Sequence, residues 1–177
     1  LMRMAEIGAT KKGGCNRQAL TDLDKEARDL WVQWAEKAGC SIRIDAMGNI
    51  FARRAGLSNN LPAVMTGSHI DTQPTGGKFD GVYGVLAGLE VIRTLNDQNI
   101  ETNNPIEAAI WTNEEGARFS PAMVGSGVWS GVFTLDYGHA RTDKSGKTIQ
   151  QELQRIGYLG ETPCKAHPVK SFIELHI

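Results

Sequence analysis

The sequence predicts a single α/β domain, and three observations support this class. Two apolar runs, Ala63–Thr66 and Ile106–Trp111, have the length and composition of buried strands. Between them lies Val82–Leu95, an almost wholly apolar segment that is long enough to be a helix connecting parallel strands, and we expect this helix to be buried. A length of 177 residues suits one domain with a sizeable core. We therefore expect a parallel strand-helix-strand core.

A helix is predicted before this core. Thr21 is suited to begin it, because Asp22 and Asp24 fall in the first turn, and Gly39 is suited to end it. Apolar residues recur between these limits at helical spacing, and an aromatic pair at that spacing is typical of a core stripe rather than of a ligand platform. The residues that we assign to the core are Ala27, Leu30, Trp31, Trp34, Ala35 and Ala38.

Further elements flank the core on both sides. Ser41–Asp45 and Ile50–Arg54 alternate around a turn that contains Gly and Asn, and this pattern predicts a β-hairpin. After the second core strand, Thr148–Ile156 has the pattern of a short helix and Val169–Ile177 that of a final strand. No internal repeat or low-complexity tract interrupts the chain, so one domain is expected.

Composition and charge exclude several classes of function. The 19 basic and 20 acidic residues give a net charge of -1, which provides no electrostatic footprint for nucleic acid or for an anionic membrane. Three cysteines without CxxC spacing fit neither a disulfide framework nor a cysteine zinc site, and they suit a reduced cytosol. No run is long enough for a signal peptide or a membrane span. We expect a cytoplasmic protein that acts on a small molecule.

Most residues suited to chemistry lie in two loops, each of which follows one of the core strands. These residues are His69, Asp71, Asp80, Glu114 and Glu115. Imidazole nitrogens and carboxylate oxygens suit zinc and its divalent neighbours, and an aspartate can bridge two metals. In open α/β sheets, ligands bind beyond the carboxyl ends of the strands, where separate loops can meet. The pattern indicates a hydrolytic metal site.

Each candidate also has a structural interpretation. His69 and Asp71 lie two residues apart, so in an extended segment they point the same way and suit a loop hydrogen bond as well as a metal ligand with its orienting carboxylate. Asp80 before a glycine is typical of a turn, and an adjacent acidic pair is commonly solvated. A single histidine in an apolar strand, as with His176, is more often structural. Arg118 is a further candidate, as a contact for a substrate carboxylate.

In order and type, these motifs resemble the metal-dependent amidases of the hydantoinase/carbamoylase family within the M20 metallopeptidase clan. The resemblance extends over almost the whole chain, and many short matches in one order make it specific. Besides the two site loops it includes Glu6–Thr10, Ala19–Thr21, Gly48–Asn49, Val124–Ser126, Ile156–Tyr158 and Glu174–Ile177. It implies a three-layer α/β/α sandwich like the catalytic domain of zinc peptidases. Residues 1–177 would be its N-terminal portion, incomplete at the C-terminus and without the lid and dimerisation domain.

The resemblance also implies roles for single residues. The implied metal ligands are His69, Asp80, Glu115 and His176, with the aspartate bridging two divalent ions, either zinc or manganese, cobalt or nickel. The implied catalytic residues are Glu114, as general base, and Asp71, which orients the imidazole of the first ligand. The piece alone is expected to hold one ion or none, because the second ion's histidine would lie beyond Ile177. His139 and His167 match no ligand in this pattern, and we expect them at the surface.

The activity that the resemblance implies is hydrolysis of the ureido C–N bond of N-carbamoyl amino acids, including N-carbamoyl-β-alanine, to amino acid, ammonia and carbon dioxide. Thr72–Lys78 favours the β-ureidopropionase-like members. Allantoate amidohydrolase, a related M20 aminoacylase or peptidase, and an inactive metal-poor fragment stay open as alternatives. The chain starts at Leu1 without a methionine and stops at Ile177 within an apolar alternation, so we expect a segment of a longer protein, whose complete form is a homodimer through the lid.

Overall fold

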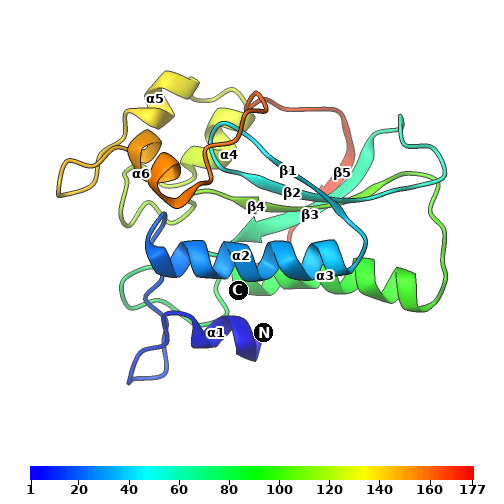
Figure 1. The fold of residues 1–177 in the computed structure, drawn as a ribbon, viewed down its shortest axis with the longest axis horizontal. Coiled ribbons are helices and arrows are strands. Elements are labelled where there is room, and N and C mark those ends of the chain that lie inside the picture. Colours follow the sequence, from blue (N-terminus) through cyan, green and yellow to red (C-terminus); the bar gives the residue numbers. More distant parts are fainter.

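A mixed five-stranded sheet forms the centre of the computed structural model, which describes all of residues 1–177. Its strands, in the order β1-β2-β4-β3-β5, are β1 (Ser41–Ile44), β2 (Ile50–Arg54), β4 (Ile106–Trp111), β3 (Ala63–His69) and β5 (Val169–Ile173) (Figure 1). β4, β3 and β5 run parallel, whereas β1 and β2 form an antiparallel hairpin that joins β4. The predicted α/β class, the hairpin and the parallel core are confirmed.

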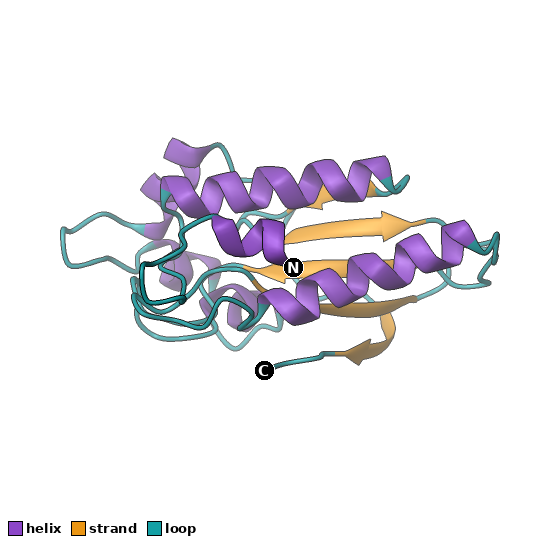
Figure 2. Ribbon diagram, turned by 90° about the horizontal axis from the view of Figure 1, so that it is seen from below, coloured by secondary structure: helices purple, strands orange, loops and turns teal.

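Two long helices cover one face of this sheet (Figure 2). α2 (Asp22–Lys37) packs on the hairpin, and α3 (Val82–Asp97) connects β3 to β4 and packs on both. The remaining helices are short: α1 (Met2–Glu6), α4 (Val124–Trp129), α5 (Leu135–His139) and α6 (Ile149–Ile156). The sequence predicted α6 but not α1, α4 or α5. None of the helices combines the length and hydropathy needed to cross a bilayer.

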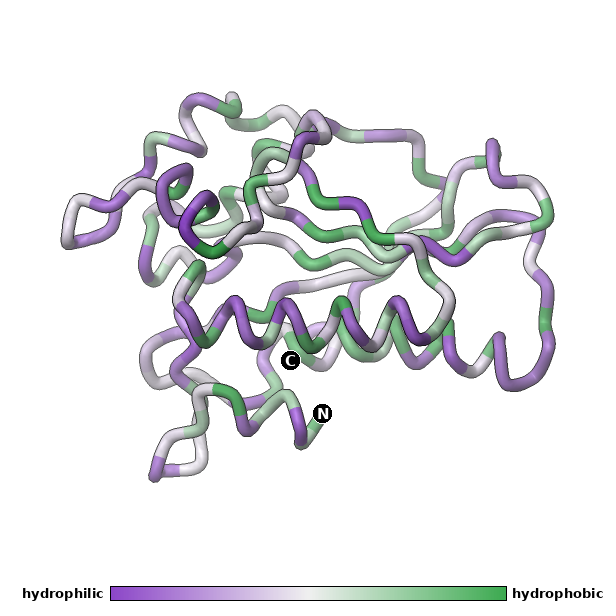
Figure 3. The backbone as a smooth tube through the Cα atoms, in the orientation of Figure 1, coloured by the Kyte–Doolittle hydropathy of each residue, from purple (hydrophilic) through white to green (hydrophobic).

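α2 begins and ends as predicted. The Thr21 hydroxyl accepts a hydrogen bond from the Asp24 amide, and Gly39 follows the helix with a positive φ. The predicted core stripe faces the sheet: Ala27, Trp31 and Ala35 are buried, and Leu30, Trp34 and Ala38 pack beside them. Figure 3 shows the resulting alternation of hydrophobic and hydrophilic residues along this helix.

An ion pair buried beneath α2 was not predicted. Arg28 Nε donates to Asp24 Oδ2 over 2.9 Å, and both side chains are 0% exposed. The guanidinium also donates to the Gly48 carbonyl and to the Thr112 hydroxyl, while the same aspartate oxygen accepts the Leu20 amide. These bonds join the helix to the hairpin turn and to the end of β4. Removing one partner of such a pair typically costs about 3–5 kcal/mol, because the other charge stays buried.

The opposite face of the sheet is covered only in part. Its buried apolar residues are Phe51, Met65, Ala109 and Trp111, packed against Trp129 of α4 and Val169. Glu107 is buried on this face and accepts a hydrogen bond from His167 Nε2 over 2.6 Å. The third layer of the expected sandwich therefore consists here of α4 and the segment around residue 167, rather than of long helices.

Both histidines expected at the surface have partners in the fold. His167 packs edge-on against Phe51 and Trp129 while it donates to the buried carboxylate. His139 Nε2 donates to the Ala46 carbonyl over 2.7 Å. Polar neighbours along the sequence suggested full exposure, but partners from distant segments leave both residues half-buried.

Two predicted elements differ in extent or burial. β5 ends at Ile173, where its register with β3 stops opposite Thr66, so residues 174–177 leave the sheet. α3 spans the predicted segment, yet it is not wholly buried: Tyr83 and Val91 are 39% and 50% exposed. The sheet covers only the inner face of α3. The helix has more apolar residues than this face can bury, so some of them are exposed.

Arg118 lies in an ionic network that docks α6. Its guanidinium donates to Asp143 over 3.0 Å, to Glu152 over 2.7 Å and to the Ala19 carbonyl over 2.9 Å. Arg155 donates to the same glutamate and lowers its pKa together with Arg118, against the opposing effect of burial. Because its donors are committed to these partners, Arg118 serves the fold rather than a substrate carboxylate.

This network predicts a loss of stability in acid. Burial opposes the pKa shift of Asp143, but hydrogen bonds from Ser145, Lys147 and Arg118 outweigh it and lower the pKa to about 2. A depressed carboxyl pKa stabilises the fold above about pH 4, and this contribution is lost as the pH falls through about 2. We expect Asp143→Asn to lower the free energy of unfolding in urea at neutral pH and to flatten its acid dependence. The exposed Glu101→Gln should match the wild type, and an unchanged acid slope in Asp143→Asn would contradict this assignment.

Candidate metal centre

The strand register brings the two site loops together. His69 is the last residue of β3 and pairs with Trp111, the last residue of β4, so both loops leave adjacent parallel strands at the same level. β5 lies on the other side of β3 and points the same way, which places the segment after Ile173 at this edge too. The carboxyl ends of all three strands therefore converge, as the sequence predicted for the two loops after β3 and β4.

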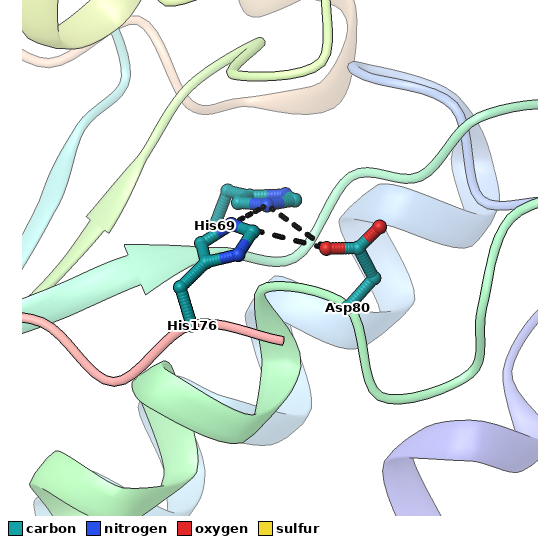
Figure 4. Close-up of side chains that lie close together, drawn as sticks. All are labelled: His69, Asp80 and His176. Atoms are coloured by element: carbon teal, nitrogen blue, oxygen red, sulfur yellow. Dashed lines mark hydrogen bonds and ion pairs between the residues drawn. The ribbon is translucent and has the colours of Figure 1, made fainter.

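Three side chains from these segments form a tight cluster. His69 comes from the end of β3, Asp80 from the loop before α3 and His176 from the segment after β5 (Figure 4). The Nε2 atoms of the two histidines are 3.2 Å apart, and Asp80 Oδ1 lies 3.8 Å from each. His69 is buried, while Asp80 and His176 are 31% and 44% exposed, so the cluster opens to solvent on one side.

Hydrogen bonding defines which nitrogen of His69 faces the cluster. Nδ1 lies 2.8 Å from the backbone carbonyl of Asp71, and a carbonyl can only accept, so Nδ1 carries the proton. In the neutral ring, Nε2 is then an acceptor that faces Asp80 and His176. Glu114 Oε2 lies 3.4 Å from the same nitrogen. This nitrogen and the two carboxylates are acceptors, and His176 Nε2 joins them when its ring is protonated at Nδ1, so the set suits a cation.

The cluster fits a divalent ion by its donors and its dimensions. Two atoms that each bind zinc at about 2.0–2.1 Å can be at most about 4.2 Å apart. The separations of 3.2 and 3.8 Å satisfy this limit. Two imidazole nitrogens and one carboxylate oxygen, with an open side, match the three-ligand pattern of catalytic zinc sites.

Asp71 joins the two loops, though not through the contact that the sequence suggested. Its carboxylate oxygens accept the amides of Glu114 and Glu115, each over 3.2 Å. The carboxylate therefore lies 3.9 Å from His69 Nδ1, and the Asp71 backbone carbonyl orients the ring instead. Burial raises the pKa of Asp71 to about 6, against the opposing effects of His69 and the two amides.

The turn after β4 aims both amides at this carboxylate. Asn113 adopts a left-handed conformation with φ 54°, which asparagine tolerates better than most residues, and its side chain donates to the Phe119 carbonyl over 2.8 Å. Just before it, the Thr112 amide donates to Asn49 Oδ1 over 2.9 Å, which ties the strand end to the hairpin turn. The buried side chains of Asn113 and Asn49 thus fix the start of this loop and the strand end before it.

The adjacent glutamates diverge, as their sequence positions predicted. Glu114 turns toward the cluster and lies within 3.4 Å of His69. Glu115 lies outside the three-residue cluster, because its carboxylate accepts hydrogen bonds from the Gln73 side chain over 2.7 Å and from the Gln73 amide over 3.3 Å. Sequence reasoning did not single out Gln73, since an exposed glutamine in a loop has no distinguishing signal.

Arg17 was also missed, although it holds the first loop from behind. Its side chain is 0% exposed and donates to the carbonyls of Ile70 over 2.8 Å and Ile7 over 2.6 Å, and its amide donates to the Thr72 hydroxyl. Its Nη2 atom is buried without a hydrogen-bond partner. The N-terminal segment therefore fixes both neighbours of Asp71. A polar stretch of sequence around Arg17 gives no hint of this burial.

A fold and site of this kind define an α/β protein with a candidate divalent-metal centre at the ends of parallel strands. A sequence model of peptidase family M20/M25/M40 matches residues 65–177, and the chain belongs to this family.

Comparison with individual proteins supports the narrower resemblance to hydantoinase/carbamoylase amidases. The chain is 54% identical over 177 residues to an N-carbamoyl-L-amino-acid amidohydrolase of Rhizobium meliloti, which is 100% of this chain and 42% of that protein. It is 33% identical over 176 residues to an allantoate amidohydrolase of Bacillus subtilis (strain 168), covering 98% of this chain and 43% of that relative. The crystal structure of a hydantoinase/carbamoylase family amidase from Burkholderia multivorans matches with a TM-score of 0.98 at 64% identity, over 99% of this chain and 43% of that one. The chain spans less than half the length of these relatives.

Gly81 provides a direct test of the cluster. It has φ 65°, and a Cβ at this position would lie 2.4 Å from the His69 Nε2 atom. We expect Gly81→Ala to displace the imidazole from Asp80 and to abolish zinc binding measured by competition with a chelator. Gly77→Ala is the matched control in the same loop, because its Cβ would meet Asp80 at an ordinary 3.7 Å. Equal zinc affinity in the two variants would argue against a site at His69 and Asp80.

Proposed function

We propose that this chain is the N-terminal portion of the catalytic domain of an enzyme that hydrolyses the ureido C–N bond of N-carbamoyl amino acids, including N-carbamoyl-β-alanine. The products would be the amino acid, ammonia and carbon dioxide. The observation that carries this proposal is the convergence of His69, Asp80 and His176 with Glu114 beside them. The name of the Rhizobium meliloti relative, at 54% identity, supports the substrate class.

The three clustered side chains would hold one divalent ion, with zinc, manganese, cobalt or nickel as candidates. When bound, such an ion supplies a Lewis acid that polarises a carbonyl oxygen and lowers the pKa of water. Glu114, which lies 3.4 Å from His69 Nε2, would accept the proton of an attacking water and return it to the leaving nitrogen. Asp71 would keep Glu114 and His69 in register through its carboxylate and its carbonyl.

In the complete enzyme we propose a second ion that Asp80 bridges and Glu115 binds. For this, Glu115 must exchange its hydrogen bonds to Gln73 for the ion. The complete enzyme would be a cytoplasmic homodimer through its lid domain, with a small ureido substrate and no nucleic-acid or membrane partner. The net charge of -1 supports the last point.

Allantoate hydrolysis is the second candidate, because an allantoate amidohydrolase is among the relatives at 33% identity and allantoate also carries ureido groups. Turnover of N-carbamoyl-β-alanine, N-carbamoyl-α-amino acids and allantoate by the complete enzyme would separate the candidates. Preference for allantoate, or cleavage of peptides alone, would overturn the carbamoyl assignment.

The role of Glu114 predicts a separation of binding from turnover. We expect Glu114→Gln in the complete enzyme to keep its metal content but to lose about 10²–10⁴-fold in kcat, since general-base catalysis contributes this much. Metal content by atomic absorption and steady-state kinetics would be measured on the same samples. A variant within about threefold of the wild type would remove Glu114 from this role.

The proposed ligands also predict a stoichiometry. We expect the 177-residue chain to bind one ion or none and to lack ureido hydrolysis, because two carboxylates without an imidazole hold a second ion poorly. Asp80→Ala should abolish binding, whereas Asp71→Ala should weaken it by about 10–100-fold, as residues that orient ligands do. Metal content after dialysis is the measurement. Two tightly bound ions per chain, or equal losses in the two variants, would contradict the assignment.

A further inference from the structure

His176 stands on a segment that the sheet does not hold. The register between β3 and β5 ends at Thr66 and Ile173, three residues before His176. Residues 174–177 are exposed, and none of the backbone hydrogen bonds in loops and turns includes them. Nevertheless His176 Nε2 lies 3.2 Å from His69 Nε2. Some other contact must place this side chain.

One side-chain hydrogen bond spans the gap. The Ser68 hydroxyl donates to Glu174 Oε1 over 2.6 Å, across a separation of 106 residues. Ser68 is fully buried and immediately precedes His69, while Glu174 lies two residues before His176. The bond therefore connects the residue before His69 with a residue two positions before His176. Glu174 itself is not one of the three clustered residues.

A glycine in α3 provides the space for this segment. A Cβ on Gly84 would lie 2.2 Å from the carbonyl oxygen of Leu175 and 2.9 Å from the Ser68 Cβ. Backbone contacts this close cannot be relieved by turning a side chain. The first turn of α3 and the end of β3 thus enclose the backbone between Glu174 and His176 from two sides.

We propose that Ser68, Glu174 and Gly84 form a latch that positions His176 at the metal centre. The latch rests on the proposed function, because its purpose is to complete a metal-binding cluster. All three are positioning residues and none contacts the cluster donors. The hydroxyl-carboxylate bond sets where the segment lies, and the missing side chain at Gly84 lets it come close enough for the imidazole to reach Asp80.

Metal affinity tests the latch directly. We expect Ser68→Ala and Glu174→Ala each to weaken zinc binding by about 10–100-fold in chelator competition. Their double variant should be no weaker than either one, because both remove the same bond. Glu174→Gln should restore most of the affinity, since its amide oxygen can accept the hydroxyl. Single variants within about threefold of the wild type, or a glutamine variant as weak as the alanine variant, would overturn the proposal.

A pair of glycine variants separates the latch from general packing. Gly84→Ala and Gly88→Ala both add a methyl group to the sheet-facing side of α3, and the second would meet Thr66 Cγ2 at 2.7 Å. Only Gly84 lies against the segment after β5. We expect Gly84→Ala to weaken zinc binding and to alter the absorption spectrum of bound cobalt. Gly88→Ala should leave the zinc affinity and the cobalt spectrum unchanged, and the two variants should have similar thermal stability. Equal effects of the two variants on zinc affinity would show that Gly84 acts through general packing and would contradict its role in the latch.

A metal-free measurement separates this proposal from the proposed function. Amide ¹⁵N relaxation of residues 175–177 reports their mobility without any ion present. We expect these amides to be ordered in the wild type and mobile in Ser68→Ala and Glu174→Ala. A complete enzyme that binds no divalent ion would end the metal assignment, yet the relaxation data would still decide the latch. Unchanged mobility in both variants would refute it.

Discussion

The candidate site depends on one carboxylate that accepts two peptide N–H groups from the neighbouring loop. Asp71 belongs to the chain after β3, and the amides of Glu114 and Glu115 belong to the chain after β4. Because the carboxylate is buried, losing either amide would leave an acceptor without a partner. The same residue supplies the carbonyl that orients His69. The carboxylate and the backbone carbonyl of Asp71 thus fix the spacing of the loops after β3 and β4, the tautomer of His69 and the direction of Glu114.

Two buried arginines connect the loops that Asp71 joins to the rest of the fold. Arg17 holds the residues on each side of Asp71, and Arg28 connects α2 to the hairpin turn and to Thr112 at the end of β4. Asn49 continues the connection by accepting the amide of the same threonine. The edge of the sheet that carries the site is therefore braced by polar side chains, whereas its centre is held by apolar packing of α2 and α3.

The sequence was informative where one local pattern decides the structure. The stripe from Ala27 to Ala35, the hairpin and the strand-helix-strand core follow from hydrophobic period, and the meeting of the two site loops follows from parallel strands. It was uninformative where a residue's environment is made by distant segments. Arg28 resembles an exposed helix residue until its partners surround it. The apolar alternation after Val169 predicted a strand through residue 177, but the pairing with β3 stops at Thr66 and Ile173, although β3 itself continues to His69.

The two histidines of the cluster are 107 residues apart in the chain. An ion bound to both would cross-link two segments that are separated by more than half of the chain. In the chain-entropy account of cross-links, closing a loop of about 100 residues lowers the entropy of the unfolded state by an amount worth roughly 4.7 kcal/mol. The ion would thereby do for this chain what a long-range disulfide does in secreted proteins, because Cys15, Cys40 and Cys164 are all free thiols. Affinity for the ion and resistance to unfolding would then be two measures of the same loop closure.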